Sequence, residues 1–195
     1  MNFLAHLFAA DRTPAFQVGC LLPDFLDANS LAGLPEEFGL GIRHHRAVDR
    51  FTDAHPAHKR TARRIGPPFE RFGPIIADVV YDHFLIGDWA SFTNEPLRDF
   101  TDSVYRSFET LHDRLPPVAQ SICTRMRSEN WLCSYGELSG IQSALNRIGA
   151  RLRRQLPLGE SIRDIELNYE AIQGDFREFF PELLTNCPAR ACLAS

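Results

Sequence analysis

The sequence predicts an all-α fold in a single compact helical domain that covers residues 1–195. The first observation is composition: 44% of the residues are apolar and 24% are charged, which suits one globular domain with a full-sized core. The second is spacing, because apolar residues recur at steps of three and four between breaks rich in proline and glycine. The third is that the strict alternation of a half-buried strand is nowhere sustained.

The charge and the cysteine content of the chain indicate which partners and which cellular compartment to expect. The formal net charge is −4 with a pI near 6.0, so no chain-wide attraction to nucleic acid or to an anionic membrane is expected. The opening MNFLAHLFAADR lacks a basic region and has a short apolar run, so neither a signal peptide nor a membrane span is predicted. Five cysteines without a Cys-x-x-Cys motif are typical of reduced, mostly buried thiols and predict a cytoplasmic protein.

The first half of the chain contains two segments in which polar residues interrupt a helical pattern. Loops are predicted at 33–41 and 66–74, where proline and glycine cluster. Between the loops, segment 44–55 carries histidines and aspartates at helical spacing. After the second loop, segment 78–85 is apolar except for its aspartates, a tyrosine and a histidine. Such groups are costly to bury unless something pairs with them, and a divalent metal is one such partner.

Three amphipathic helices are predicted in the second half of the chain. Each is marked by one row of apolar residues at steps of three and four, the spacing of a single helix face. The rows are Phe100, Val104, Phe108, Leu111 and Leu115; Leu138, Ile141, Leu145, Ile148 and Leu152; and Ile162, Ile165, Tyr169, Ile172, Phe176 and Phe179. Pro96 suits the start of the first of these helices.

The candidate metal ligands come from three places in the sequence. On a helix, His45 and Asp49 are one turn apart and point to the same side, and Asp53 continues that row. Asp24 follows Pro23 in an apolar context without an evident surface role. Asp82 and His83 form the third group, with Asp78 one turn before Asp82. Imidazole and carboxylate are the ligands that manganese, iron and zinc commonly take, and carboxylates favour the harder ions.

Each candidate also has a structural interpretation that the spacing leaves open. An i, i+4 pair such as His45 and Asp49 is most often a surface hydrogen bond. Asp24 suits a helix cap, and Asp82 with His83 suits a buried hydrogen-bonded pair. His6 is more commonly a core histidine than a ligand. Three further histidines lie in polar surroundings and are expected at the surface: His44, His58 and His112.

Taken in order, the motifs resemble those of the acyl carrier protein phosphodiesterases, a divergent branch of the HD-type metal phosphohydrolases. The resemblance runs through most of the chain. It rests on Met1 to Leu7, Gly19 to Phe25, Gly41-Ile42, His45-Arg46 with Asp49, Phe51 to Asp53, His55-Pro56, Asp82 to Leu85, Trp131-Leu132 and Tyr135.

The resemblance implies an HD-phosphohydrolase-like domain that uses manganese. Such enzymes hydrolyse the phosphodiester between 4′-phosphopantetheine and a serine of holo-acyl carrier protein, giving apo-acyl carrier protein and free 4′-phosphopantetheine. By this resemblance the catalytic and metal-binding residues are Asp24, His45, Asp49, Asp82 and His83, with His6, Asp53 and Asp78 around them. Two features depart from the family pattern: the doublet reads Asp82-His83 rather than His-Asp, and Pro23 stands where relatives commonly have alanine.

An acidic carrier protein requires a cationic surface on this chain. Two basic stretches qualify: Lys59, Arg60, Arg63 and Arg64, which is the preferred surface; and Arg147, Arg151, Arg153 and Arg154. A solvated helix face is the commoner origin of such runs. Phe69, Phe72 and Trp89 are candidates for lining a channel for the pantetheine arm, although core packing is the more common role of such residues.

Two other functions compete with the carrier-protein hydrolase. The same fold and metal could serve a nucleotide or another small phosphoester, because fold does not determine substrate. Alternatively, a non-catalytic helical binding protein could retain these residues as a polar network. The resemblance, and not the spacing, favours the first function over these two.

Overall fold

Helices form all the regular structure in the computed structural model, which describes residues 1–189. No strand occurs within this range, so the predicted all-α class is confirmed. The α-helices are α1 (Phe3–Ala9), α2 (Pro14–Gly19), α3 (Leu22–Phe25), α4 (Ala28–Ala32), α5 (Gly39–Ala54), α6 (Pro56–Arg63), α7 (Gly73–Gly87), α8 (Leu97–Leu111), α9 (Pro117–Ser128), α10 (Trp131–Ser134), α11 (Leu138–Arg151), α12 (Ile162–Leu167) and α13 (Tyr169–Asn186). Short 3₁₀ segments are η1 (Glu36–Phe38), η2 (Glu70–Phe72), η3 (Trp89–Ser91), η4 (His112–Arg114) and η5 (Leu158–Ser161).

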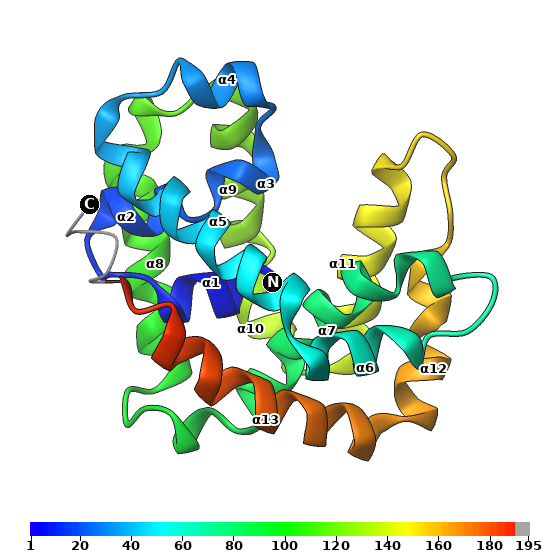
Figure 1. Cartoon of the computed structure of the whole chain (residues 1–195). Coiled ribbons are helices and arrows are strands. Elements are labelled where there is room, and N and C mark those ends of the chain that lie inside the picture. The colour runs from blue at the N-terminus through cyan, green and yellow to red at the C-terminus, as the bar shows by residue number, and fades with distance from the viewer. Residues whose placement is uncertain (190–195) are drawn as a thin grey trace.

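Helix α5 runs through the middle of the molecule and packs closely against α2, which also contacts α8 (Figure 1). Two glycines allow this approach. A Cβ atom at Gly41 would overlap the carbonyl of Phe16, and one at Gly19 would lie 2.5 Å from the carbonyl oxygen of Phe38. Only glycine permits backbones to come this near. The close packing brings the backbone after α2 within reach of the polar side chains on α5.

Helices α6, α7 and α13 pack together below α5 in the view of Figure 1. Their shared core is aromatic: Tyr81 of α7 and Phe176, Phe179 and Phe180 of α13 are fully buried. Tyr81 meets Phe179 with ring centroids 5.3 Å apart. Large aromatic side chains contribute much of the buried apolar area of a core, so this packing holds α7 firmly in place.

Helix α11 stands apart from α3 and α9, with the N-terminus between them (Figure 1). Its base packs against α7, and η5 covers its other side. Gly149 lies near the end of α11, where a Cβ atom would overlap the carbonyl of Leu156 in the returning chain. Two pockets lie between α11 and the helices α3 and α9.

Several predicted boundaries differ from the structure. The helix predicted over 162–179 is two helices, with Asn168 between α12 and α13 at φ −113° and ψ 16°. The apolar row continues across this break because both helices face the same core. The predicted loops end early, since α5 begins at Gly39 and α7 at Gly73. Helix α8 ends at Leu111, so Leu115 lies beyond it.

The prediction that His44 and His58 lie at the surface is wrong. His44 is fully buried against Phe16, and His58 is 2% exposed and packs on Tyr81. The charged residues next to them in the sequence point to solvent from other faces of α5 and α6. The polarity of these neighbours therefore led to a wrong prediction for the two histidines. His112 is partly exposed, as expected.

The proposed channel aromatics behave as core residues. Phe69 and Trp89 are buried in the main cluster, and Phe72 packs against it. Cys20 and Cys123 are buried, Cys133 and Cys187 are partly exposed, and Cys192 lies outside the described residues. Within residues 1–189, no helix combines the length and apolar character needed to cross a bilayer.

Candidate active site

One face of α5 carries the first two residues of the site. His45 and Asp49 are one helical turn apart, and His45 Nε2 lies 2.9 Å from Asp49 Oδ2. The His45 side chain is 4% exposed, whereas that of Asp49 is 38% exposed. The pair therefore joins a buried imidazole to a carboxylate that reaches solvent.

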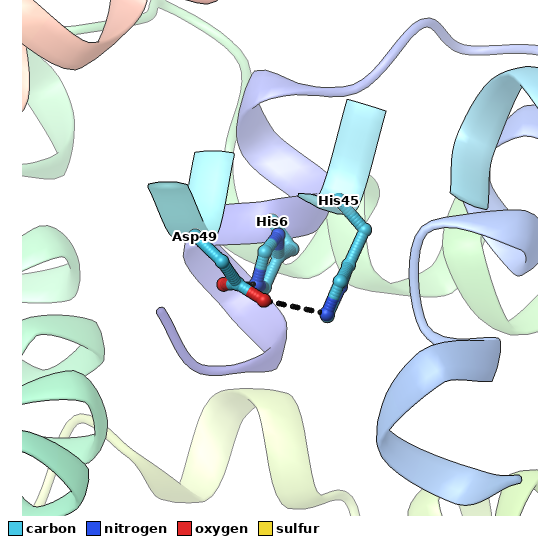
Figure 2. A group of neighbouring side chains, drawn as sticks. All are labelled: His6, His45 and Asp49. Carbon is cyan, nitrogen blue, oxygen red and sulfur yellow. Dashed lines mark ion pairs between the residues drawn. The ribbon is translucent and has the colours of Figure 1, made fainter. Parts of the chain in front are cut away.

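The third residue, His6, comes from α1. Its fully buried ring stacks on His45 with centroids 4.1 Å apart and an interplanar angle of 13°. His6 Nε2 lies 3.2 Å from Asp49 Oδ1. Figure 2 shows the two rings side by side with Asp49 across from them. The ligand atoms of the three residues all lie within 4.8 Å of one another.

His45 is oriented by the backbone that follows α2. Its Nδ1 lies 2.7 Å from the carbonyl oxygen of Cys20, which can only accept, so Nδ1 carries the proton. In the neutral ring, Nε2 then presents a lone pair toward the Asp49 carboxylate. Two acceptors facing each other at 2.9 Å repel, so this arrangement favours either a proton or a metal cation between them.

The pKa values follow from burial and from these contacts. Burial lowers the pKa of His6 to about 3, so this ring is neutral at physiological pH. Burial alone would also lower the pKa of His45, but the bond to Asp49 and the charge of Asp24 raise it instead. Burial opposes ionisation of Asp49, yet His45 and His6 hold its pKa well below the usual range. The site thus keeps an ionised carboxylate beside two imidazoles.

Two more carboxylates adjoin the cluster. Asp24, on α3, places Oδ1 3.9 Å from His45 Nε2. Asp78, on α7, lies 2.9 Å from His58 Nε2 and 3.1 Å from the main-chain amine of Met1. That amine is also 3.2 Å from Asp49 Oδ1, and these carboxylates raise its pKa to about 10 against the effect of burial. The local potential therefore favours positive charge.

The residues of this cluster fit a divalent metal. Both ring nitrogens of His6 are buried and make no hydrogen bond within residues 1–189, although Nε2 lies 3.2 Å from Asp49 Oδ1. A buried nitrogen without a partner is costly, and binding a metal would remove that cost. Two imidazoles with the carboxylates of Asp49 and Asp24 form a mixed nitrogen and oxygen set, which suits manganese, iron or zinc.

The structure does not bring Asp82 and His83 to this cluster. Asp82 is fully buried and accepts hydrogen bonds from Asn2 Nδ2 at 2.8 Å and from the main-chain N–H groups of Leu4 and Ala5, each at 2.9 Å. It therefore holds the start of α1. Burial raises the pKa of Asp82 to about 7, although the three donors oppose this shift.

His83 points to another part of the fold. Its Nδ1 lies 3.0 Å from the Tyr135 carbonyl and its Nε2 lies 2.8 Å from the Tyr169 hydroxyl. Asp53 is exposed, one turn beyond Asp49, and is not among the three clustered residues. The assignment of Asp82 and His83 as metal ligands, with Asp53 near the metal site, stays a prediction from the resemblance.

The preferred basic surface on α6 is partly neutralised by α13. Arg60 pairs with Asp175 and Glu178, and Arg64 Nη2 lies 3.1 Å from Asp175. Lys59 donates to the carbonyl of Ala54 at 3.0 Å. Arg63 is exposed and has no carboxylate partner within the described range. Sequence patterns do not show such pairing, because the partners lie more than a hundred positions away.

Two contributors to the site were missed by sequence reasoning. His58 was expected at the surface, but it binds Asp78 beside the N-terminus. Asn2 donates to Asp82 and so helps to position α1. No spacing signal links these residues, since each pair joins separate helices or segments. The only hint was that Asn2 lies within the opening motif.

An all-helical domain with a buried cluster of histidines and carboxylates defines the class of this protein, and comparison with known sequences gives the family. The family model described as acyl carrier protein phosphodiesterase matches residues 1–183. Relatives with that name include one from Pectobacterium atrosepticum, 32% identical over 94% of this chain and 96% of its own length. Another, from Enterobacter sp., is 34% identical over the same shares. A third, from Escherichia coli (strain K12 / DH10B), is 31% identical over 98% of this chain and 100% of its own.

The chain therefore belongs to the acyl carrier protein phosphodiesterase family, as the sequence motifs predicted. No solved structure matches it.

Proposed function

We propose that this chain hydrolyses the phosphodiester that joins 4′-phosphopantetheine to a serine of holo-acyl carrier protein. The observation that carries the proposal is the cluster of His6, His45 and Asp49, which lies next to Asp24 in a chain that matches the family along almost its whole length. The products would be apo-acyl carrier protein and free 4′-phosphopantetheine.

The reaction breaks one bond and forms another. The oxygen of water bonds to phosphorus, the bond between phosphorus and the serine oxygen breaks, and a proton given up by the water ends on the serine oxygen. A divalent metal, which we propose to be manganese, would polarise the phosphodiester and make water more acidic. His6 and His45, through their ring nitrogens, and Asp49 and Asp24, through their carboxylates, would hold that metal. The Cys20 carbonyl keeps His45 turned so that Nε2 faces the site.

The HD-type relationship is part of the same proposal. Its support is the combination of an all-helical fold with a mixed histidine and carboxylate cluster. The Asp82-His83 doublet is not among the three clustered residues, and its hydrogen-bonding groups contact the start of α1 and the Tyr169 hydroxyl. We further propose that the enzyme acts in the cytoplasm, on the basis of its substrate and of its reduced-cysteine composition.

The test is the mass of intact holo-acyl carrier protein after incubation with the enzyme and manganese. We expect the wild type to remove the phosphopantetheine mass and an Asp49→Asn variant to leave it in place. Magnesium and iron should be tried in parallel. If the carrier protein stays intact with all three metals, the proposed substrate is wrong, and turnover of nucleotides or small phosphoesters would support the alternative hydrolase.

A further inference from the structure

Two pockets lie between α11 and the helices opposite it, and they meet at two residues. The inner pocket, about 320 Å³, is lined by Met1, Asn2, Phe3, Asp24, Ile75, Asp78, Val79, Ile148, Arg151 and Leu152. The outer pocket, about 650 Å³, is lined by Asp24, Phe25, Pro117, Val118, Ser121, Ile122 and Arg151. Asp24 and Arg151 are common to both. These volumes fall in the range of small-molecule sites, about 300–1,000 Å³.

Arg151 differs from Arg60 and Arg64 in having no ion-pair partner within residues 1–189. It is exposed at the last position of α11, and no carboxylate within residues 1–189 pairs with it. A guanidinium group without a partner beside Asp24 is suited to a phosphate, because its planar N–H groups match two phosphate oxygens at once. Arg151 is therefore a candidate to hold an anion next to the cluster.

The inner pocket is the smaller of the two, its lining is mainly apolar, and it reaches the buried Met1. Ile75, Val79, Ile148 and Leu152 form its apolar wall. Val79 is almost fully buried, whereas Ile75 is 37% exposed at the mouth. A slender chain with amide groups and few charges fits such a space better than a folded protein surface does.

The outer pocket is broader and opens on the exposed start of α9. Val118 is 56% exposed and is one of the few large apolar side chains at the surface of the described chain. Exposed Arg153 and Arg154 follow Arg151 closely in the sequence, and neither has an ion-pair partner within the described range. An exposed apolar patch with unpaired cations nearby suits an acidic protein.

We propose that the substrate phosphodiester lies between Asp24 and Arg151, with the pantetheine arm in the inner pocket and the carrier protein on the outer one. This inference rests on the proposed function and deepens it, because it assigns each half of the substrate to its own surface. It also moves the carrier-protein surface from α6 to the end of α11 and the start of α9. In this assignment Arg151 binds the phosphate common to both halves.

The test uses the two products as separate inhibitors of holo-acyl carrier protein hydrolysis. Ile75→Trp fills the mouth of the inner pocket, and we expect it to weaken inhibition by free 4′-phosphopantetheine about tenfold or more. Val118→Glu places a negative charge on the outer pocket, and we expect a similar loss of inhibition by apo-acyl carrier protein. Each variant should leave inhibition by the other product within about twofold of the wild type. Arg151→Gln should weaken inhibition by 4′-phosphopantetheine.

Matched controls are available at Leu167 on α12, which is 83% exposed and lines neither pocket. Leu167→Trp and Leu167→Glu repeat the same changes and should leave both inhibition constants at wild-type values. All four sites are at least partly exposed, so these variants should fold. If Ile75→Trp and Arg151→Gln bind 4′-phosphopantetheine as the wild type does, the inner-pocket assignment is wrong. If Val118→Glu binds apo-carrier protein normally, the outer-pocket assignment is wrong. A wild type that cannot hydrolyse holo-carrier protein would instead overturn the proposed function.

Discussion

The two histidine and aspartate groups of this chain use the same residue types in opposite ways. In the cluster of His6, His45 and Asp49, neither ring nitrogen of His6 makes a hydrogen bond within residues 1–189, and His45 Nε2 faces the Asp49 carboxylate. In the Asp82-His83 doublet, protein groups already contact both oxygens of Asp82 and both nitrogens of His83. The first group therefore has ring nitrogens available for a cation, whereas the second is already engaged in hydrogen bonds within the protein.

The difference shows that burial alone does not reveal the role of a polar residue. Its hydrogen-bond partners must be counted as well. Asp82 is more deeply buried than Asp49, and by burial alone it would be the better candidate for a special role. Its three donors make it a structural acceptor for the start of α1. Asp49 instead lies beside two imidazoles and Asp24, a combination of groups that we propose to be a metal ligand set.

The largest expected effect follows from removing the Asp49 carboxylate. Asp49→Asn should reduce hydrolysis of holo-acyl carrier protein by about 100-fold or more, because it loses the central charged ligand. Manganese binding, measured by calorimetry, should weaken in parallel. Asp53→Asn, one turn further along α5 and exposed, is the matched control and should remain within about twofold of the wild type. Equal losses in both variants would contradict the proposed cluster.

Asp82→Asn should mainly lower the stability of the folded protein. An asparagine cannot accept from all three donors, and its own N–H₂ group would face main-chain N–H groups, so the unfolding free energy should fall by roughly 3 kcal/mol. Urea denaturation of both proteins measures this change. A variant that keeps wild-type stability but loses manganese would show that Asp82 is a ligand, as the resemblance implies.

Two adjacent histidines on α5 should respond to pH with opposite signs. Burial lowers the pKa of His44 to about 4, whereas the pKa of His45 is raised. Between pH 6.5 and 4 the unfolded chain binds a proton at position 44 that the folded chain does not. The contribution of His44 to the unfolding free energy therefore falls by up to about 1.4 kcal/mol for each unit by which the pH is lowered.

The measurement is urea denaturation at several pH values between 7 and 5, for the wild type and for His44→Leu. The variant should lose stability less steeply as pH falls, because leucine does not titrate. Parallel curves for the two proteins would show that burial does not keep His44 neutral.

The smallest expected effect is at His83. His83→Gln keeps groups able to bond with the Tyr135 carbonyl and the Tyr169 hydroxyl, so the loss of stability should be about 1 kcal/mol or less. Hydrolysis should stay within about threefold of the wild type, with unchanged manganese affinity. A tenfold loss of that affinity would place His83 among the ligands after all.

Local spacing predicted the part of the site that lies on one helix. His45 and Asp49 share a face of α5 because they are four residues apart, and a sequence shows that directly. His6 reaches them only because α1 packs beside α5, which no local pattern records. The break at Asn168 was missed because α12 and α13 bury one continuous apolar row.

The role of Asp82 was beyond sequence reasoning for a different reason. Its donors are main-chain N–H groups, which every residue except proline carries, so residue types give no sign of them. The basic runs could be recognised in the sequence. Whether their side chains are available to bind a partner depends on carboxylates that lie far away along the chain. Arg60 and Arg64 are paired with α13, whereas Arg151 is not paired within the described chain.

We expect the contact between Asp82 and α1 to set an order of assembly. Helix α1 has seven residues, too few for a stable helix in isolation, and its first turn is held by a carboxylate 77 and 78 positions further along the chain. During synthesis, His45 and Asp49 emerge long before that carboxylate does. His6 is made before the other two, but we expect it to join them only after α7 has been added, because Asp82 of α7 holds the start of α1.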